Sequence, residues 1–225
     1  NGHFLIDGGL PQSAEVIKQN IQALGFDVRD VEWLLNSHAH YDHAGGLASL
    51  QRMSGAPIAA SSKTLKALEL GHALPDDPQY ATDNTMAFPA VASVRTIRDG
   101  ETLALGGVTV TAHDTPGHAP GGNSWSWESC EAGKCITIVF ADSLNPVSEP
   151  DYRFSDHPAY LTAFRQSIAK VRALDCDILV SAHPEFSNLF ERAAAGSLVD
   201  ANGCRKYADA AEARLDKRLA QETAE

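Results

Sequence analysis

Ser37-His38-Ala39-His40-Tyr41-Asp42-His43-Ala44-Gly45-Gly46 is the stretch that decides the fold. It places three imidazoles and one carboxylate within six positions, directly after the apolar run 31–35. If that run is a strand, the loop after it can present alternate residues His38 and His40 to one side. The other two ligand side chains then serve a second ion. Imidazole with carboxylate suits zinc, iron or manganese, so the stretch predicts a metal site rather than a plain surface loop.

The length and composition indicate one globular domain. The chain has 225 residues, of which 44% are hydrophobic and 21% charged. Its net charge of -11 argues against nucleic-acid binding, which needs basic patches. No apolar run approaches the roughly 18 residues that span a bilayer, and the N-terminus does not resemble a signal peptide. We therefore expect a soluble monomer with a single domain over 1–225 and no nucleic-acid or membrane partner.

The N-terminus begins with a turn signal that no strand precedes. Asn1-Gly2 is a dipeptide typical of a hairpin turn, and the strand-like run 3–7 follows it directly. We therefore expect the natural protein to carry an upstream strand, and a leader before that strand, which this sequence lacks.

The four cysteines occur in two suggestive places. Cys130 and Cys135 bracket a short glycine-containing loop, which a local disulfide could close. Cys176 and Cys204 lie near the ends of the last expected strand and the last expected helix, where a bridge would pin the C-terminal helix. An even number in these places favours an oxidising compartment, with buried thiols as the alternative. The sequence therefore predicts an exported protein.

The first half of the chain alternates strands and helices. A strand over 3–7, a helix over 13–24 capped by Ser13, and a strand over 31–36 form a βαβ unit, so the sheet is at least partly parallel. We then expect a helix over 45–53, a strand over 57–60 and a helix over 61–70. A long loop follows over 71–91, in which Met86 and Phe88 either line a substrate cleft or pack against the domain.

The second half begins with short alternating strands. Three strands over 94–97, 102–105 and 108–112, joined by glycine turns, predict a meander. Further strands are expected over 123–128, 136–140 and 177–181, and helices over 160–174 and from Arg205 onward. The loops between these elements carry His118, Asp142 and His183.

Six ligand-type residues lie in loops at the ends of expected strands, where open sheets present function. They divide naturally into two groups of three: His38, His40 and His118, and Asp42, His43 and His183. Three imidazoles form an open site that lowers the pKa of bound water to about 7. The other four histidines do not lie in such loops: His3, His72, His113 and His157. Of these, His113 lies in a strand-like run close to His118 and is expected to pack or stay exposed.

These motifs resemble a known family. His38-Ala-His40-Tyr-Asp42-His43, Pro116-Gly117-His118, and His183 in Ser-Ala-His-Pro are similar to the signature of the metallo-β-lactamase superfamily. More closely, the chain resembles the third subclass of class B β-lactamases over essentially its whole length. The segments that carry this closer resemblance are Asp7-Gly8-Gly9, 37–40, 115–121, 141–144, 172–179 and 204–210.

The resemblance implies a fold, an activity and a set of residues. The fold is the four-layer αββα sandwich with mixed sheets and the metal site at the loop edge. The activity is zinc-dependent hydrolysis of the β-lactam amide bond of penicillins, cephalosporins and carbapenems by a metal-bound hydroxide, which confers antibiotic resistance in the periplasm or outside the cell. The family's pattern assigns one zinc ion to each group of three and pairs Cys176 with Cys204 and Cys130 with Cys135.

The resemblance also implies roles around the ions. Asp42 orients the water, and Ser143 and Asn145 point toward the substrate carboxylate. Asn145 stands where a hydroxyl residue is common in the subclass, which is a departure from the pattern.

Two other kinds of protein remain open. One is a thioester, lactone or phosphodiester hydrolase of the same fold; many of these use an aspartate that bridges both metals in the loop where Asp142 lies. If Asp142 rather than Ser143 faces the ions, the subclass assignment weakens. The other is a binding protein that keeps the ligands without turnover. No Gly-x-Ser-x-Gly motif appears, so nothing indicates a serine nucleophile.

Overall fold

The computed structural model describes residues 2–83 and 85–224. The chain divides into two compact units, and the predicted single domain stays a prediction. Unit 1 comprises Asn1–Arg98, Leu105–Gly107 and Ala119–Gly121, and unit 2 comprises Asp99–Ala104, Val108–His118 and Gly122–Glu225. Asn1 of the predicted hairpin turn lies outside the described residues.

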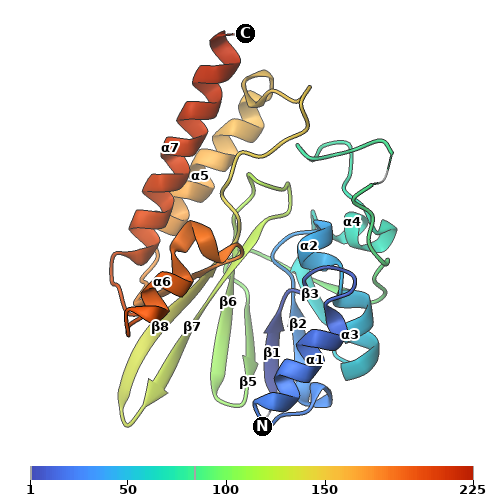
Figure 1. The fold of residues 1–225 in the computed structure, drawn as a ribbon, viewed down its shortest axis with the longest axis vertical. Helices are drawn as coiled ribbons and strands as arrows, with labels where there is room; N and C mark the ends of the chain where they lie inside the picture. The colour runs from blue at the N-terminus through green and yellow to red at the C-terminus, as the bar shows by residue number, and fades with distance from the viewer. Residues whose placement is uncertain (1, 84, 225) are drawn as a thin grey trace. The chain divides into compact units, whose positions relative to one another are not determined.

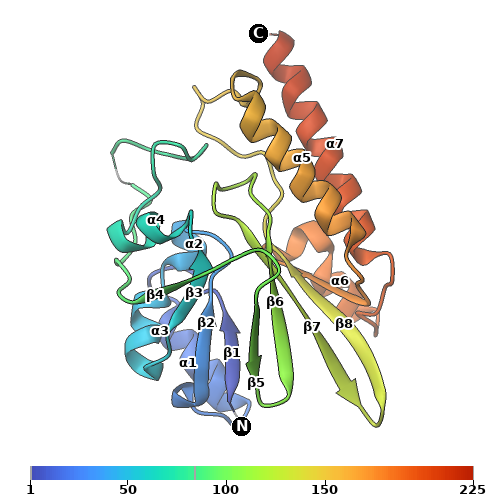
Figure 2. The same cartoon turned by 180° about the vertical axis from the view of Figure 1, so that it is seen from behind.

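Unit 1 is built on a parallel sheet of order β1-β2-β3-β4 (Figures 1 and 2; β4 is labelled in Figure 2). Its strands are β1 (His3–Ile6), β2 (Val31–Leu35), β3 (Ile58–Ser61) and β4 (Val94–Ile97). Its helices are α1 (Ala14–Ala23), α2 (Tyr41–Ala44), α3 (Leu47–Ser54) and α4 (Leu65–Leu70). Apolar residues of α1 and α3, such as Ile17 and Leu47, share one core with β2 and β3. The predicted βαβ unit is confirmed by the parallel pairing of β1 with β2.

Unit 2 is built on a mixed sheet of order β5-β6-β7-β8-β9. Its strands are β5 (Thr102–Leu105), β6 (Val108–Asp114), β7 (Asn123–Glu131), β8 (Lys134–Ala141) and β9 (Ile178–Ser181). β6, β7 and β8 are antiparallel neighbours, whereas β8 and β9 run parallel. Helices α5 (Pro158–Ala173) and α7 (Gly203–Ala224) lie side by side in both views (Figures 1 and 2). Their apolar faces share a core with β8 and β9.

One sequence expectation about the strands is wrong. The strand over 94–97 does not belong to a meander, because β4 pairs in parallel with β3 from Val94 to Ile97, while β5 lies in the other sheet. The turn that follows β4 leads into the other sheet, where the backbone N–H of Gly100 donates to Ala112 O of β6 at 2.8 Å. Alternating apolar residues predict strands but do not identify their partners. The short helix α6 (Leu189–Ala194) was not predicted, and none of its residues is buried.

Both predicted disulfides are present. Cys130–Cys135 joins directly paired residues of the β7–β8 hairpin, and Cys176–Cys204 joins the segment before β9 to the first turn of α7. Among the described residues, no helix is long and apolar enough to cross a membrane.

Met86 and Phe88, both in the long loop 71–91, differ in burial. Phe88 is 7% exposed and belongs to the core of unit 1, and its backbone N–H donates to Gly71 O at 2.7 Å. Met86 is half exposed. Phe88 therefore packs against its own unit, which was the alternative to lining a cleft.

Candidate metal centre

The end of β2 presents a cluster of imidazoles. Asn36 and Ser37 follow the strand, both buried, and Asn36 Nδ2 donates to His38 O at 2.8 Å, which fixes the chain as it leaves the sheet. The His38 ring meets the His40 ring edge-on with centroids 4.6 Å apart, and lies 4.1 Å from the His43 ring. The ring of His38 therefore lies close to those of both His40 and His43.

The short helix α2 carries the other two ligand-type residues of this loop. His40 precedes its first residue, and the backbone N–H of His43 donates to His40 O at 3.0 Å. One helical turn therefore carries Asp42 and His43, and His43 Nε2 lies 3.4 Å from Asp42 Oδ2. A single turn of helix is too short to produce a periodic pattern, so the sequence did not predict it.

Glycines allow two loops to meet behind this cluster. A Cβ on Gly8 would lie 2.5 Å from Leu47 N, and one on Gly46 would lie 2.2 Å from Gly8 O. The backbone N–H of Gly8 donates to His43 O at 2.7 Å. Because only glycine permits this approach, the Asp7-Gly8-Gly9 segment delivers the Asp7 side chain to the histidine loop.

Asp7 organises the loop as a shared acceptor. Its carboxylate accepts from the backbone N–H of Ser37 at 2.7 Å, from Ser37 Oγ at 2.6 Å and from Asn36 Nδ2 at 3.3 Å. It also contacts His43 Nδ1 at 3.0 Å. Ser37 Oγ in turn lies 3.2 Å from His38 Nδ1. A single buried carboxylate thus orients two of the imidazoles.

His40 has a separate acidic partner. Its Nε2 lies 3.0 Å and 3.1 Å from the two oxygens of Asp77, which is 6% exposed. Gln79 Nε2 lies 3.4 Å from the other ring nitrogen, Nδ1. Asp77 comes from the 71–91 loop, 37 positions further along the chain, and no motif in the sequence marked it.

His118 of unit 2 is held through the main chain. Its Nδ1 contacts the carbonyl oxygen of Asn145 at 2.9 Å. Ser167 Oγ on α5 donates to Pro116 O at 2.6 Å, and a Cβ on Gly117 would lie 2.2 Å from the buried Phe164 ring. The Pro-Gly-His sequence therefore lets this loop lie flat on α5.

His183 follows the last strand of unit 2. Ser181 Oγ donates to His183 O at 2.7 Å, which fixes the backbone beyond β9. The His183 ring meets Phe186 edge-on at 6.2 Å, and its Nδ1 lies 3.8 Å from Glu185.

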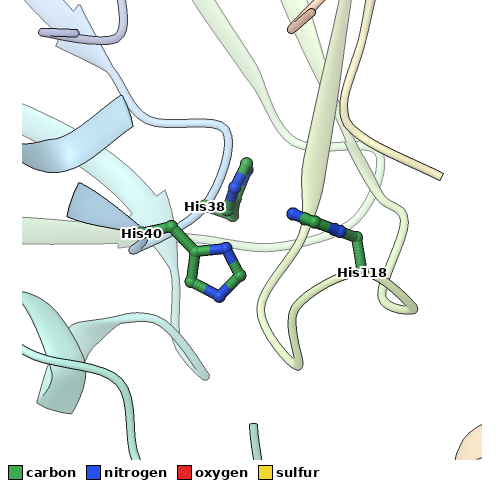
Figure 3. Close-up of side chains that lie close together, drawn as sticks. All are labelled: His38, His40 and His118. Carbon is green, nitrogen blue, oxygen red and sulfur yellow. The ribbon is translucent and has the colours of Figure 1, made fainter. Parts of the chain in front are cut away.

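The six predicted ligand residues form the two predicted groups. His38, His40 and His118 make one group, and Asp42, His43 and His183 the other; within each, one ligand atom per residue lies within 4.8 Å of the others. Figure 3 shows the first group, with His38 and His40 on the loop after β2 and His118 on the loop after β6.

The hydrogen bonds suit these residues to metal binding. His38, His43 and His118 each use Nδ1 toward a protein partner, which makes Nε2 the candidate ligand atom. His40 uses Nε2 toward Asp77, so its candidate ligand atom is Nδ1. Metal-binding histidines are characteristically oriented by such contacts of the second ring nitrogen. The structure therefore supports two sites, each with three nitrogen or oxygen ligands.

Electrostatics favour a cation at the second group. Burial alone would lower the pKa of His43, but hydrogen bonds to Asp42 and Asp7 outweigh it and raise this pKa to about 10. Without a metal ion, the ring therefore holds a proton between two carboxylates. A metal ion that binds there must displace that proton.

The predicted substrate residues lie in the loop after β8. Ser143 is 1% exposed and Asn145 is 3% exposed, and Asn145 Nδ2 donates to Ser143 Oγ at 3.2 Å. Asp142 is fully buried, with Oδ2 2.5 Å from where a Cβ on Gly122 would stand, and it belongs to neither group of described ligands.

The other four histidines are placed outside both groups. His3 packs on Phe26, His72 Nδ1 contacts Ala73 O, His113 Nε2 contacts Ser126 Oγ, and His157 stacks on Tyr152. The expectation that His113 packs or stays exposed agrees with its contact with Ser126.

Comparisons with known proteins agree with this geometry. The family model of the metallo-β-lactamase superfamily matches residues 1–183. The solved structure of the Rm3 metallo-β-lactamase is 49% identical, covers 99% of this chain and 85% of its own, and has a TM-score of 0.94. The MIM-1 metallo-β-lactamase of Novosphingobium pentaromativorans is 44% identical, covers 99% of this chain and 82% of its own, and has a TM-score of 0.94.

Curated relatives match less of their own length. A hydroxyacylglutathione hydrolase of Anaeromyxobacter dehalogenans is 32% identical over 171 residues, which are 69% of this chain and 56% of that protein. A probable metallo-hydrolase of Burkholderia pseudomallei is 33% identical, and the match spans 48% of this chain and 34% of the relative. The predicted fold class is confirmed by the solved structures. With a matching family model and two histidine-rich ligand groups, the chain belongs to the metallo-β-lactamase superfamily.

Proposed function

We propose that this chain is a zinc-dependent β-lactamase of subclass B3, which hydrolyses the amide bond of penicillins, cephalosporins or carbapenems and so confers resistance to them. The proposal rests on one observation: a chain with both ligand groups is also 43–49% identical to solved β-lactamase structures, over 98–99% of this chain and 85–87% of theirs. A soil-metagenome protein described as a subclass B3 metallo-β-lactamase, MEM-A1, is among them at 47% identity.

Each ligand group would hold one zinc ion. His38, His40 and His118 are the proposed ligands of the first ion, and Asp42, His43 and His183 of the second. When bound, the ions supply Lewis-acid chemistry, which lowers the pKa of water and polarises a carbonyl group. Imidazole and carboxylate ligands without a thiolate are compatible with zinc.

Asp42 has a second proposed role. It is the one carboxylate among the six ligands, so one of its oxygens can bind the ion while the other accepts a hydrogen bond from the attacking water. Its position on α2, next to His43, keeps the carboxylate beside the ligand atoms. Asp42 would therefore orient the water for attack on the lactam carbonyl.

Ser143 and Asn145 are proposed to recognise the substrate carboxylate. Because Asn145 Nδ2 donates to Ser143 Oγ, the serine hydroxyl keeps its own proton for an acceptor such as a carboxylate. Asn145 would thus act through Ser143, which accounts for an amide where a hydroxyl residue is expected.

The alternative is another hydrolase of the same fold. The similarity to a hydroxyacylglutathione hydrolase makes a thioester substrate the specific rival. A bridging aspartate at Asp142 would favour it, yet Asp142 stands in neither described ligand group. The higher identity over the whole chain also favours a β-lactam substrate.

The two disulfides support a location outside the cytoplasm. We therefore place the protein in the periplasm or outside the cell, and we propose that it acts there as a monomer.

Hydrolysis of a carbapenem, measured by the loss of its ultraviolet absorbance, tests the proposal. We expect turnover that a chelator abolishes and added zinc restores. His38→Ala should lose most of this turnover, whereas the matched variant His3→Ala, which loses an imidazole packed on Phe26, should keep it. Full zinc occupancy with thioester cleavage but no β-lactam cleavage would establish the alternative.

A further inference from the structure

The hydroxyl group of Tyr207 on α7 holds the loop after β8. It donates to Asp142 O at 2.8 Å and accepts from the backbone N–H of Leu144 at 3.3 Å. Tyr207 is 3% exposed, and Asp142 and Leu144 are fully buried. The sheet ladder ends at Ala141, so one side-chain atom satisfies two main-chain groups that the ladder no longer pairs.

The same loop orients His118. Asn145, the residue after Leu144, accepts from His118 Nδ1 at 2.9 Å through its carbonyl oxygen. That oxygen also accepts from the backbone N–H of Val147 at 2.9 Å. The carbonyl fixes the ring and its tautomer, so its place decides where His118 Nε2 points.

Helix α7 provides a rigid base for this contact. Cys204, one helical turn before Tyr207, is joined to Cys176 beside β9. Tyr207, Ala208 and Ala211 are all buried in the core of unit 2. Burial and the nearby Asp142 raise the pKa of Tyr207, so its hydroxyl keeps the proton that it donates.

We propose that Tyr207 is a positioning residue for the first metal ion: through the 142–145 loop, its hydroxyl sets the orientation of His118 and hence the affinity of the group that contains His118. The inference rests on the part of the proposed function that assigns a metal ion to His118, and not on the choice of substrate. Tyr207 acts through the main chain and touches neither ion nor substrate.

The test is Tyr207→Phe in the full chain, titrated with Co²⁺ after metal removal. Competition with a chelator gives the two affinities, and the absorption of bound Co²⁺ reports its ligand geometry. We expect about a tenfold weaker affinity for one ion, with a changed absorption spectrum, and an unchanged affinity for the other. Glu222→Gln is the matched control, because it weakens the attachment of the same helix α7 at Phe154 and Ser155 and not at the 142–145 loop.

The outcomes are distinguishable. If Tyr207→Phe lowers the free energy of unfolding but keeps both affinities, the hydroxyl is only structural and the inference is wrong. If Glu222→Gln weakens the same ion equally, general loosening of α7 explains the effect and the inference is also wrong. If the wild-type chain binds two ions but cleaves no β-lactam, the proposed function fails while a selective loss in Tyr207→Phe still supports this inference.

Discussion

Units 1 and 2 hold their histidines in different ways. In unit 1, the partners of the imidazoles are side chains, with Asp7 on His43, Asp77 on His40 and Ser37 on His38. In unit 2, His118 relies on the carbonyl group of Asn145, in a loop anchored by Tyr207. One substitution can remove a side-chain partner. A main-chain carbonyl group is present in every residue type, so a substitution can only displace it. Unit 1 should therefore be sensitive at single residues, and unit 2 at the helix that supports its loop.

Asp7→Ala should produce the largest effect. It removes the acceptor of three buried donors, which are the backbone N–H of Ser37, the hydroxyl group of Ser37 and one N–H of the Asn36 amide. Each buried donor that loses its acceptor costs about 1–3 kcal/mol. We expect the free energy of unfolding of the metal-free chain to fall by about 3 kcal/mol or more, measured by urea denaturation. Binding of the second ion should weaken as well, because the Nδ1 of His43 loses its contact with Asp7.

Asp7→Asn is the matched control for this prediction. Asparagine tolerates the positive φ of 60° at this position and keeps one acceptor oxygen, but carries no charge. It should recover part of the lost stability. An Asp7→Ala chain as stable as the wild type would show that unit 1 does not depend on this side chain.

Asp77→Asn should have a more selective effect. The amide keeps the shape but removes the charge beside His40 Nε2, so the orientation of that ring is less well fixed. We expect about a 10–100-fold weaker affinity for the first ion, measured by chelator competition. Asp76→Asn, one position earlier, is its control and should change little. Equal losses in both variants would contradict a specific role for Asp77.

The contrast between side-chain and main-chain partners also explains which parts of the fold and the site could be predicted from the sequence. The two clusters of ligand-type residues were predictable because five imidazoles and an aspartate stand next to expected strand ends. The strand–helix–strand order of 3–36 predicted the parallel sheet. Asp77 was not predictable, since its contact with His40 spans 37 positions. The contact between His118 and the carbonyl oxygen of Asn145 was not predictable either, because every residue type supplies a main-chain carbonyl group. The partner of β4 was missed for a similar reason, as pairing between strands depends on the tertiary fold.

The two disulfides offer a test of how α7 supports unit 2. Replacing Cys176 and Cys204 by serine opens a loop with a sequence separation of 28, whereas replacing Cys130 and Cys135 opens one of 5. The chain-entropy model predicts that the first pair contributes about 1.5 kcal/mol more to stability. We expect only the first double variant to weaken binding at His118 as well, measured by the same Co²⁺ titration. Equal metal affinity in both variants would separate the disulfide from the metal site.

Glu222→Gln should have the smallest effect, and one that depends on pH. Burial alone would raise the pKa of Glu222, but hydrogen bonds from Arg218 and from the backbone N–H groups of Ser155 and Phe154 lower it to about 2. Because the folded pKa is below the unfolded value of about 4.5, the ionised group stabilises the fold above that pH. This contribution is lost as the pH falls from about 4.5 to about 2.

We therefore expect Glu222→Gln to lower the free energy of unfolding by about 1–2 kcal/mol at pH 7, less than the full pKa shift implies because Arg218 is partly exposed. The difference from the wild type should shrink as the pH approaches 2 in urea denaturation. Metal affinity should not change, since this end of α7 contacts the 153–155 segment and not the 142–145 loop. A constant difference at every pH would mean that the charge of Glu222 does not stabilise the helix, and that its shape alone holds the end of α7 in place.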